Sequence, residues 1–342
     1  MLKPIVIGGM HQLEPALLNY EQALRLNPNY AEANWSKSYV LLLLGRYNEG
    51  WPLYEWRRRI NLFQNALRPQ GNPLLPGTEL KNHDKVFIYC EQGLGDTIQF
   101  CRYVKALAQK NANIFFQVPK VLRSLIQSLD PKISLVNAED GIPEFDYQTS
   151  VMSLPWFFGT TLETIPHQSS YLSPSGQAME QWAEAIGKKT KPRIGLVWAG
   201  AANHSNDLKR GIPLEQMVTI LSPNYEWHSI QCEYREEDQK FMNDHPEIIQ
   251  HQDEIKDFDD TAALVEHMDL IISRDTSVAH LAGALGKPVW ILLPCVPDFR
   301  WLMDRQDSPW YPSAKLYRQV VPGEWRSVLE RIKRDIEERL FT

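Results

Sequence analysis

The sequence predicts an α/β fold with two parallel-sheet domains, preceded by a short helical segment. Three observations lead to this prediction. Helical spacing dominates residues 16–59, and strand-like apolar runs alternate with helix-like runs from residue 86 onward. Two strand-to-helix junctions carry polar segments with an acid, Glu91-Gln-Gly-Leu-Gly-Asp-Thr97 and Asp275-Thr-Ser-Val-Ala-His280. Such junctions present amide groups and a helix N-terminus to an anion, so two of them indicate a ligand cleft between two nucleotide-fold domains.

The composition is that of a soluble globular protein. The chain has 342 residues, enough for two or three domains, with 43% apolar and 23% charged residues. A net charge of −6 argues against a general nucleic-acid binder. The longest apolar run, residues 39–44, is too short to span a bilayer, and the N-terminus lacks a secretion-signal pattern. The scattered cysteines Cys90, Cys101, Cys232 and Cys295 form no CxxC pair, which predicts buried free thiols in a reducing cytoplasm.

The first predicted segment, residues 1–66, is helical. One helix stops at Asn27-Pro28, a second spans about residues 31–44 and ends at Gly45, and a third runs from about residue 48 to the basic end 57–59. On a period of about 34 residues, the segment resembles the tetratricopeptide pattern at Ala16, Tyr20, Ala23, Pro28, Ala31, Gly45, Tyr47, Gly50 and Tyr54, with Gly50 where alanine is usual. Little more than one repeat cannot bury a core, so the segment either leans on the next domain or ends a longer array.

The two sheet domains are predicted at residues 80–175 and 190–342. A linker rich in Pro, Gly and Asn at residues 67–85 leads into the first. The first domain has predicted strands at residues 86–90, 114–118, 133–136 and 147–151, and helices at 97–109 and 120–129. A crossing segment with a helix at 176–186 follows. The second domain has predicted strands at residues 193–198, 227–231, 270–273 and 289–293, and helices at 214–221, 260–267, 277–285 and 325–339. Repeated βα units predict parallel sheets flanked by helices.

Asp96 is the candidate functional acid of the first junction. Gly93 and Gly95 let the backbone turn tightly and approach a ligand closely, and Asp96 stands where the next helix begins. The alternative is that Asp96 only caps that helix. The pattern matches neither the dinucleotide fingerprint GxGxxG nor the phosphate loop GxxxxGKS/T, which argues against a dehydrogenase and a kinase.

The second junction is the sharper signal. Asp275 and Thr276 directly follow an apolar strand, and the helix after them is rich in small residues, with His280 one turn along. The alternative is an ordinary helix cap beside a histidine that is satisfied in the core. Lys209 and Arg210 lie in a loop that also follows a predicted strand, where they are either solvated charges or contacts to a diphosphate.

Other patterns exclude some chemistries. Asp257-Phe-Asp259-Asp260 precedes a helix, so its acids are interpreted as helix-start residues and not as a metal site. The histidines show no HExxH or zinc-type spacing, and no GxSxG nucleophile elbow occurs. The aromatic residues of segment 294–312 either pack that loop onto its domain or offer a ring to a base or an acceptor.

These motifs together resemble bacterial tetratricopeptide-linked proteins with a glycosyltransferase family 9, or heptosyltransferase-like, domain. The resemblance runs nearly end to end, through Tyr47-Asn-Glu-Gly-Trp51, residues 91–100, Gly195-Leu-Val-Trp-Ala-Gly200, residues 275–288 and Asp307-Ser-Pro-Trp-Tyr-Pro312. It implies a GT-B fold of two Rossmann-like domains facing a cleft. The N-terminal half would take the acceptor and the C-terminal half the nucleotide-sugar donor, without a required metal or any cofactor beyond the donor.

The resemblance also implies roles for single residues. Asp96 corresponds to the catalytic base after the glycine loop formed by Gly93 and Gly95. Asp275, Thr276 and His280 resemble the donor-binding Asp-Thr-Gly-x-x-His segment, with Ser277 in place of the glycine. Arg210 stands near the position of a phosphate-binding lysine, and Lys209 competes with it for that role.

The predicted function is an inverting, metal-independent transfer of a sugar from a nucleotide-diphosphate sugar to a hydroxyl of a glycan, lipid or protein. Asp96 would accept the proton of that hydroxyl, and the loop cations and helix amides would stabilise the departing diphosphate. Two alternatives remain: a non-catalytic scaffold with a degenerate glycosyltransferase fold, and a GT-B-like nucleotide-sugar epimerase. The helical segment is a candidate surface for a protein partner, whereas no nucleic-acid partner and no membrane span are expected.

Overall fold

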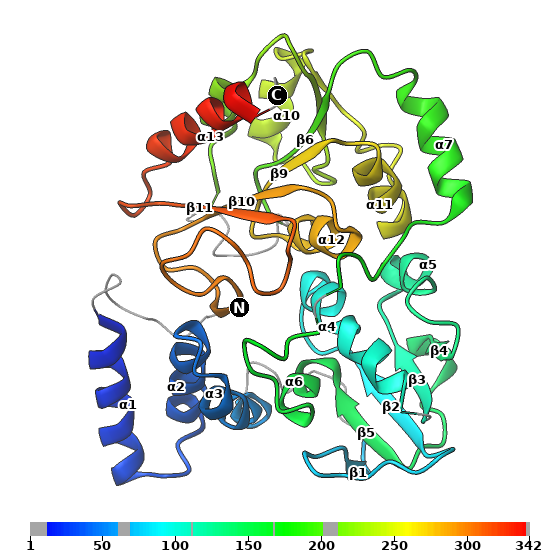
Figure 1. Ribbon diagram of the computed structural model, residues 1–342, viewed down its shortest axis with the longest axis vertical. Helices are drawn as coiled ribbons and strands as arrows, with labels where there is room; N and C mark the ends of the chain where they lie inside the picture. The colour runs from blue at the N-terminus through cyan, green and yellow to red at the C-terminus, as the bar shows by residue number, and fades with distance from the viewer. Residues whose placement is uncertain (1–11, 61–68, 111, 167, 201–210, 340–342) are drawn as a thin grey trace. The chain divides into compact units, whose positions relative to one another are not determined.

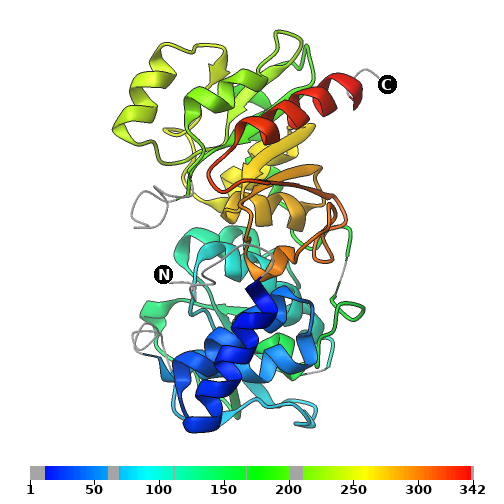
Figure 2. The ribbon, with the colours of Figure 1, turned by 90° about the vertical axis from the view of Figure 1, so that its left-hand side faces the viewer.

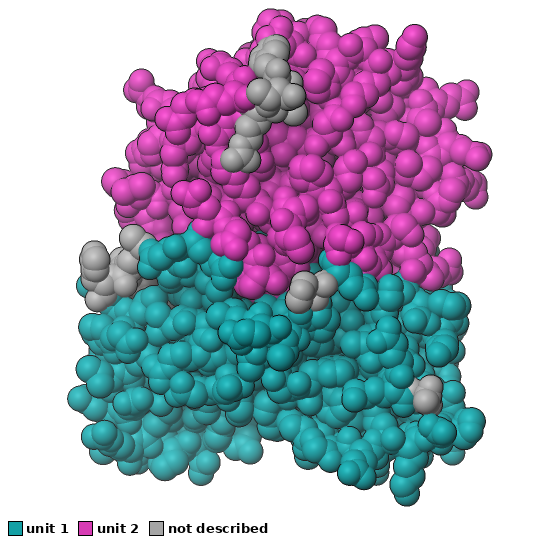
Figure 3. All heavy atoms as spheres, in the orientation of Figure 1, with its two compact units in different colours: residues 1–123, 129–168, 296–305 teal, residues 124–128, 169–295, 306–342 magenta. Residues whose placement is uncertain are grey.

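The computed structural model describes residues 12–60, 69–110, 112–166, 168–200 and 211–339. The chain divides into two compact units, which Figure 3 colours separately. Unit 1 contains Met1–Arg123, Leu129–Gln168 and Val296–Arg305, and unit 2 contains Ser124–Ser128, Ser169–Cys295 and Gln306–Thr342. Segment 296–305 therefore groups with unit 1, although the sequence predicted it inside the C-terminal domain.

Unit 1 begins with the predicted helices. They are α1 (Leu13–Leu26), α2 (Ala31–Leu43), α3 (Tyr47–Tyr54) and the 3-10 helix η2 (Glu55–Arg59), which Figure 1 and Figure 2 show beside one another. A Cβ atom on Gly50 would lie 2.7 Å from Cδ2 of Leu42, so the close approach of α2 and α3 explains why glycine stands there. The helices are confirmed, and the tetratricopeptide likeness stays a prediction.

The aromatic side chains of these helices are covered within unit 1. Tyr39, Trp51 and Tyr54 are each at most 5% exposed, and all three pack edge-on against the ring of Phe299, with centroid distances of 5.4 to 5.8 Å. Trp51 also contacts Phe100 of α4 (Leu94–Ala108) at 6.4 Å. Burying large aromatic rings supplies much of the stability of such a contact. The segment therefore leans on its neighbours in unit 1, which is one of the two alternatives left by its short length.

Unit 1 contains a five-stranded parallel sheet. Its strands are β1 (Asn72–Pro73), β2 (Lys85–Tyr89), β3 (Asn113–Gln117), β4 (Ile133–Val136) and β5 (Tyr147–Ser150), in the spatial order β1-β5-β2-β3-β4. The strand order reverses between β2 and β5. The unit also holds the short helices η4 (Lys120–Leu122), η5 (Ala138–Asp140), η6 (Val151–Ser153), α6 (Leu154–Phe157) and η8 (Phe299–Trp301), whereas α5 (Arg123–Ile126) has only its first residue in unit 1.

Unit 2 contains a six-stranded parallel sheet. Its strands are β6 (Arg193–Val197), β7 (Glu226–Ser229), β8 (Ile248–Ile249), β9 (Leu270–Arg274), β10 (Val289–Leu293) and β11 (Ala314–Arg318), ordered β11-β10-β9-β6-β7-β8. Numbered from β6, the order is 6-5-4-1-2-3, that of the doubly wound dinucleotide-binding fold. The direction of winding reverses between β6 and β9, whose paired residues include Val197 and Ser273.

Helices cover both faces of the unit 2 sheet. They are α7 (Gly176–Ile186), α9 (Leu214–Met217), η7 (Val218–Ile220), α10 (Glu236–Asn243), α11 (Phe258–Glu266), α12 (Ser277–Leu285) and α13 (Arg326–Arg339). Helix α13 buries Val328, Ile332 and Ile336 in one core with residues of β6 and β9, while α11 and α12 lie on the opposite face (Figure 1).

The structure corrects several details of the sequence prediction. All eight predicted strands exist within about two residues, but β1 lies in the predicted linker, and β8, β11 and α10 were not predicted. The predicted helix 120–129 is instead the 3-10 helix η4 followed by α5, which ends at Ile126, where the Ser128 hydroxyl and amide both donate to the carbonyl of Leu125. All four cysteines are free, yet Cys101 alone among them is buried and Cys232 is exposed, because it follows β7 in a surface loop.

None of the helices in the described part of the chain combines the length and the apolar character needed to span a bilayer.

Candidate functional site

Both predicted ligand segments lie where strand order reverses. In unit 1, the glycine loop leaves β2 next to β5, and Tyr89 of β2 pairs with Ser150 of β5. In unit 2, the Asp275 segment leaves β9 next to β6. In open parallel sheets, ligands bind at the carboxyl ends of the strands at such a switch point. Each unit therefore carries one candidate half-site, in the position that its topology favours.

Asp96 sits inside the first turn of α4 and not at its cap. The N-cap residue is Gly93, with φ −73° and ψ 171°, and Asp96 is the third helical residue. Its Oδ2 accepts the Gly93 N–H at 2.8 Å, which is one half of a capping box; the other half is missing because glycine has no side chain to accept the amide of residue 96. Gly95 lies within the helix. Neither glycine needs the left-handed region, which corrects the expected tight turn; at Gly93, a Cβ atom would lie 3.2 Å from Oδ2 of Asp96.

Arg300 holds the other oxygen of Asp96. Its Nη2 donates to Oδ1 of Asp96, its Nε to Oε1 of Gln99 at 2.5 Å, and its Nη1 to Oδ1 of Asp298 at 2.7 Å. All four side chains belong to unit 1. The Arg300 side chain is 7% exposed, whereas that of Asp96 is 18% exposed. The carboxylate of Asp96 is therefore fixed on both oxygens and still reaches the surface.

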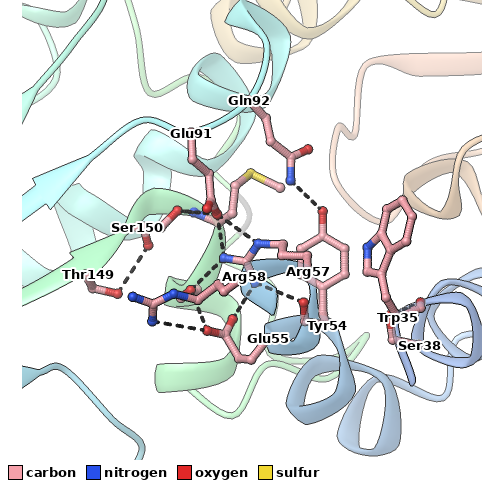
Figure 4. Close-up of polar contacts among 12 residues, drawn as sticks. Trp35, Ser38, Tyr54, Glu55, Arg57, Arg58, Glu91, Gln92, Thr149 and Ser150 are labelled. Carbon is pink, nitrogen blue, oxygen red and sulfur yellow. Dashed lines mark hydrogen bonds and ion pairs between the residues drawn. The ribbon is translucent and has the colours of Figure 1, made fainter. Parts of the chain in front are cut away.

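Glu91, at the start of the same loop, is a structural acid (Figure 4). Its side chain is 2% exposed, and its Oε1 accepts from Nε of Arg57 at 2.8 Å, from Nη2 of Arg57 at 2.5 Å and from the Ser150 hydroxyl at 2.5 Å. Burial opposes the positive charge of Arg57, but Glu55 and Glu91 raise its pKa. The pair thus ties η2 to the end of β2 and leaves Glu91 little access to a substrate.

The neighbouring residue of the loop is also bound to the helical segment. The Gln92 amide donates to the Tyr54 hydroxyl at 3.0 Å (Figure 4). Together with the Glu91–Arg57 pair, this bond means that two successive loop residues are held by side chains of α3 and η2. The helical segment therefore forms part of the support of the unit 1 half-site.

In unit 2, Asp275 and His280 lie together at the β9–α12 junction. Oδ1 of Asp275 is 3.6 Å from Nε2 of His280, and Nδ1 of His280 is 2.9 Å from the Tyr311 hydroxyl. A Cβ atom on Gly283 would lie 2.3 Å from the Tyr311 ring, so the small residue lets that ring reach His280. Asp275 is 24% exposed and His280 is 6% exposed at the side chain. The expected proximity of Asp275 and His280 is confirmed, and the histidine is also buried, as its alternative expected.

Thr276 is the N-cap of α12, but its side chain does not cap the helix. Its Oγ1 lies 3.1 Å from Oγ of Ser273. Ser277 is the first helical residue, and the first amides of a helix have no intrahelical acceptor. An anion at this junction would meet those amides and the positive end of the helix dipole.

The two predicted cations, Lys209 and Arg210, lie outside the described residues. The loop that carries them begins after β6 and returns at Ile212, whose N–H bonds to the carbonyl of Trp198 at 3.4 Å. It therefore departs from the strand next to β9 at the switch point of unit 2.

The remaining motifs serve the fold. Asp257 caps α11 through the amides of residues 259 and 260, Asp259 accepts from Ser175, and Asp260 accepts from Trp182, which confirms the helix-start interpretation. The aromatic residues of segment 294–312 are buried, which agrees with the alternative that they pack the loop onto its unit: Phe299, Trp301, Trp310 and Tyr311.

The sequence analysis missed four polar residues of these sites: Tyr39, Gln99, Asp298 and Arg300. A signal for one of them exists. Arg300 interrupts an aromatic run between Phe299 and Trp301, and a charge inside a run that must be buried requires a partner. The sequence does not say that this partner is Asp96, 204 residues away.

Comparisons with known proteins agree with this architecture. Residues 256–292, which hold α11, β9 and α12, match the model of glycosyltransferase family 9 (heptosyltransferase). The protein FlbA of Caulobacter vibrioides is 25% identical over 353 aligned positions, which cover 94% of this chain and 58% of FlbA. The chain thus spans somewhat over half the length of this curated relative.

Two solved structures share the fold. The glycosyl transferase family 9 protein of Veillonella parvula DSM 2008 superposes with a TM-score of 0.58 and 13% identity, covering 77% of this chain and 99% of that one. The ADP-heptose lps heptosyltransferase II of E. coli superposes with a TM-score of 0.51 and 14% identity, covering 75% and 98%. The fold is therefore an α/β fold with parallel sheets, similar to these GT-B-type proteins. Together with the family match, it supports a glycosyltransferase.

Proposed function

We propose that this protein transfers a sugar from a nucleotide-diphosphate sugar to an acceptor hydroxyl, with inversion at the anomeric carbon and without a metal. The observation that carries the proposal is the junction of β9 and α12. Asp275, Thr276 and His280 lie there at the switch point of a doubly wound sheet, within the segment that matches family 9. Such a junction offers helix amides to a diphosphate and side chains to the donor.

The acceptor half of the reaction is assigned to unit 1. Asp96 is its base: the carboxylate accepts the proton of the acceptor hydroxyl while the oxygen attacks the anomeric carbon. The bond from that carbon to the diphosphate breaks, and negative charge grows on the departing phosphate oxygen. The amides at the start of α12 and the cations Lys209 and Arg210 stabilise this charge. Gly93 and Gly95 belong to the loop that presents Asp96. The cleft expected between the two domains stays a prediction.

A binding panel tests the donor half. The full chain is titrated calorimetrically with ADP, UDP and GDP, and then with the corresponding nucleotide sugars. ADP-heptose is included because it appears in the name of the E. coli heptosyltransferase II. One nucleoside diphosphate should bind, with unchanged affinity in EDTA. Arg210→Ala should weaken its binding by about 1.5–3 kcal/mol if the guanidinium makes a charge-assisted contact. Lys240→Ala is the control, because Lys240 is exposed and pairs with Glu236 on α10.

The outcomes separate the alternatives. Unchanged affinity in both Arg210→Ala and Lys209→Ala would remove their loop from the site. If none of the nucleotides binds, the non-catalytic scaffold is favoured. Release of an isomerised nucleotide sugar, with no sugar on any acceptor, would favour an epimerase. The anomeric configuration of a transferred sugar, read by NMR coupling constants, tests inversion.

A further inference from the structure

A chain of buried polar contacts connects helix α2 to Asp96. The Tyr39 hydroxyl donates to Oδ2 of Asp298 at 2.9 Å, and Oδ1 of Asp298 accepts from Nη1 of Arg300. Arg300 in turn donates to Asp96. These residues come from three separate parts of the sequence, and all of them belong to unit 1. We call Tyr39, Asp96, Gln99, Asp298 and Arg300 the Arg300 cluster.

The guanidinium of Arg300 is used on every side. Its three nitrogen atoms each donate to a different acceptor, on Asp96, Gln99 and Asp298. Its central carbon also lies near the rings of Phe299, 4.7 Å from the centroid, and Phe100, at 5.4 Å. Because the guanidinium is planar and rigid, hydrogen bonds in three directions fix its orientation. It therefore also fixes the orientation of the side chains to which it donates.

Asp96 receives its second restraint from its own helix, because Oδ2 accepts the amide of Gly93. Because Arg300 also donates to Oδ1, the carboxylate of Asp96 is restrained against rotation about its Cβ–Cγ bond. An acceptor hydroxyl would then meet a carboxylate whose lone pairs already point in fixed directions. Pre-organisation of this kind raises the rate of the chemical step without improving the binding of either substrate.

We propose that Arg300 is the positioning residue of Asp96, and that Tyr39 of the helical segment fixes Arg300 through Asp298. The proposal rests on the proposed function, in which Asp96 is the base. The N-terminal helices then contribute to turnover, because Tyr39 of α2 holds Asp298, which is 259 residues away in sequence, and so supports Asp96 indirectly. Within the Arg300 cluster, each other residue acts through its neighbour, and only Asp96 touches the substrate.

The kinetic test uses the full chain and the nucleotide sugar that the binding panel selects, with release of the nucleoside diphosphate as the readout. Arg300→Gln should lower kcat about 10- to 100-fold and leave the KM for the donor within about twofold, since misplaced groups affect the chemical step. Arg300→Lys should lie between Arg300→Gln and the unchanged protein, because lysine keeps the charge and loses the planar fork. Tyr39→Phe, which removes one hydroxyl and keeps the ring on Phe299, should lower kcat by a few-fold. Arg46→Gln should have no effect, because Arg46 forms an exposed pair with Glu49 outside the cluster.

A double-mutant cycle shows whether Arg300 acts through Asp96. In the Asp96→Asn background, Arg300→Gln should cause no further loss of kcat, because the group that it positions is already gone. Losses that multiply in the double variant would overturn the proposal, and so would a rise in donor KM that accounts for the whole effect.

A measurement without substrate separates this proposal from the proposed function. Hydrogen exchange of the Gly93 amide reports on its bond to Asp96. Arg300→Gln should accelerate this exchange, and Arg46→Gln should not. Unchanged exchange would overturn the positioning role even in an active enzyme. Accelerated exchange together with near-normal turnover of Asp96→Asn would keep the positioning and remove the base.

Discussion

At the scale of single residues, Asp96 differs from a simple helix cap in having two different partners. One oxygen accepts a backbone amide and the other accepts a guanidinium. An amide side chain cannot replace both acceptors, because it has one oxygen and one NH2 group. The sequence alone predicts a nearly free exchange of Asp for Asn at a cap. The structure predicts a cost, since either Gly93 or Arg300 would then face a donor.

Asp96→Asn should therefore change two measurements. Turnover should fall by roughly two to four orders of magnitude, the usual contribution of a general base. The free energy of unfolding should fall by about 1–3 kcal/mol, because a donor is left without an acceptor. The affinity for a nucleoside diphosphate should stay the same, because that half-site lies in unit 2. Kinetics, denaturant unfolding and calorimetry on the same preparation check the three statements.

Asp140→Asn is the matched control. Asp140 is likewise the third residue of its helix, its Oδ2 accepts the backbone amide of Asn137 at 3.3 Å, and it lies outside both half-sites. It should affect stability slightly and turnover not at all. Near-normal turnover of Asp96→Asn would remove the base from this loop altogether. Glu91 is no substitute, because its side chain is buried against Arg57.

The sequence predicted the candidate residues of the two junctions, but it did not predict the side chains that bind Asp96. Asp96, Asp275 and His280 could be predicted because each follows an apolar strand within a few residues, and strand ends meet at one edge of a parallel sheet. Tyr39, Asp298 and Arg300 could not be placed beside Asp96, since their contacts depend on how α2 and segment 296–305 pack. Local periodicity carries no information about such contacts.

At the scale of elements, strand prediction succeeded where the strand is buried on both faces. β10 is a continuous apolar run, β9 begins with three apolar residues before Ser273 and Arg274, and both strands are fully buried. β11 was missed because Lys315 and Arg318 give it a polar appearance. In the structure, Lys315 forms an ion pair with Asp335 of α13 and lies over the Trp290 ring, which makes its place in the sheet favourable. Only the packing of the helix reveals this compensation.

A buried histidine pair joins β7 to the segment after β8. Nδ1 of His228 lies 2.9 Å from Nε2 of His251, and both rings are at most 5% exposed. Burial lowers the pKa of His228 to about 4, and the neighbouring His251 and Arg193 act in the same direction. Burial also lowers the pKa of His251, against the opposing effect of Glu254. Both rings are therefore neutral at pH 7.

The pair predicts a loss of stability in mild acid. An unfolded histidine with a pKa near 6.5 takes up a proton that the folded pair does not accept. The unfolded state then binds more protons, so the free energy of unfolding decreases as the pH falls from about 6.5 toward 4. The expected decrease between pH 7 and pH 5 is on the order of 1–2 kcal/mol. Urea unfolding at pH 7, 6 and 5 measures it.

The pH range in which the histidines lower the free energy of unfolding differs from the range in which the nearby carboxylate of Glu226 does so. Although burial acts in the opposite sense, hydrogen bonds from Thr190 and Arg193 hold the pKa of Glu226 at about 2. Its contribution is therefore lost below pH 4.5. His251→Gln should flatten the profile above pH 5, with His245→Gln as the control, because His245 is 28% exposed at its side chain and lies outside the pair. An equally steep profile in His251→Gln would assign the acid sensitivity to other groups.

At the scale of the whole molecule, the helical segment behaves as part of unit 1 and not as an appendix. It covers the rings of Phe100 and Phe299, pairs Arg57 with Glu91, and bonds Tyr39 to Asp298. A segment with so few helices was expected to need neighbours. The sequence left open which neighbours these are, because the contacts join residues that are far apart along the chain.

Deleting residues 1–66 should therefore damage the protein well beyond the loss of three helices. Glu91 and Asp298 would remain without Arg57 and Tyr39, and removing one partner of a buried ion pair typically costs about 3–5 kcal/mol. The two exposed phenylalanine rings would add an apolar surface that favours association. The truncated chain should be poorly soluble or melt at a clearly lower temperature than the full chain.

A shorter deletion provides the control. Removing residues 1–29 takes away α1, whose buried residues are Leu13 and Leu17, and leaves Tyr39, Trp51 and Arg57 in place. It should lower the melting temperature less than the longer deletion and keep the exchange of the Gly93 amide slow. If the 1–66 deletion is monomeric and as stable as the full chain, the helices are an independent module and their contacts to Glu91 and Asp298 contribute nothing to the fold. If only the longer deletion accelerates exchange at Gly93, the helical segment supports the loop that carries Asp96.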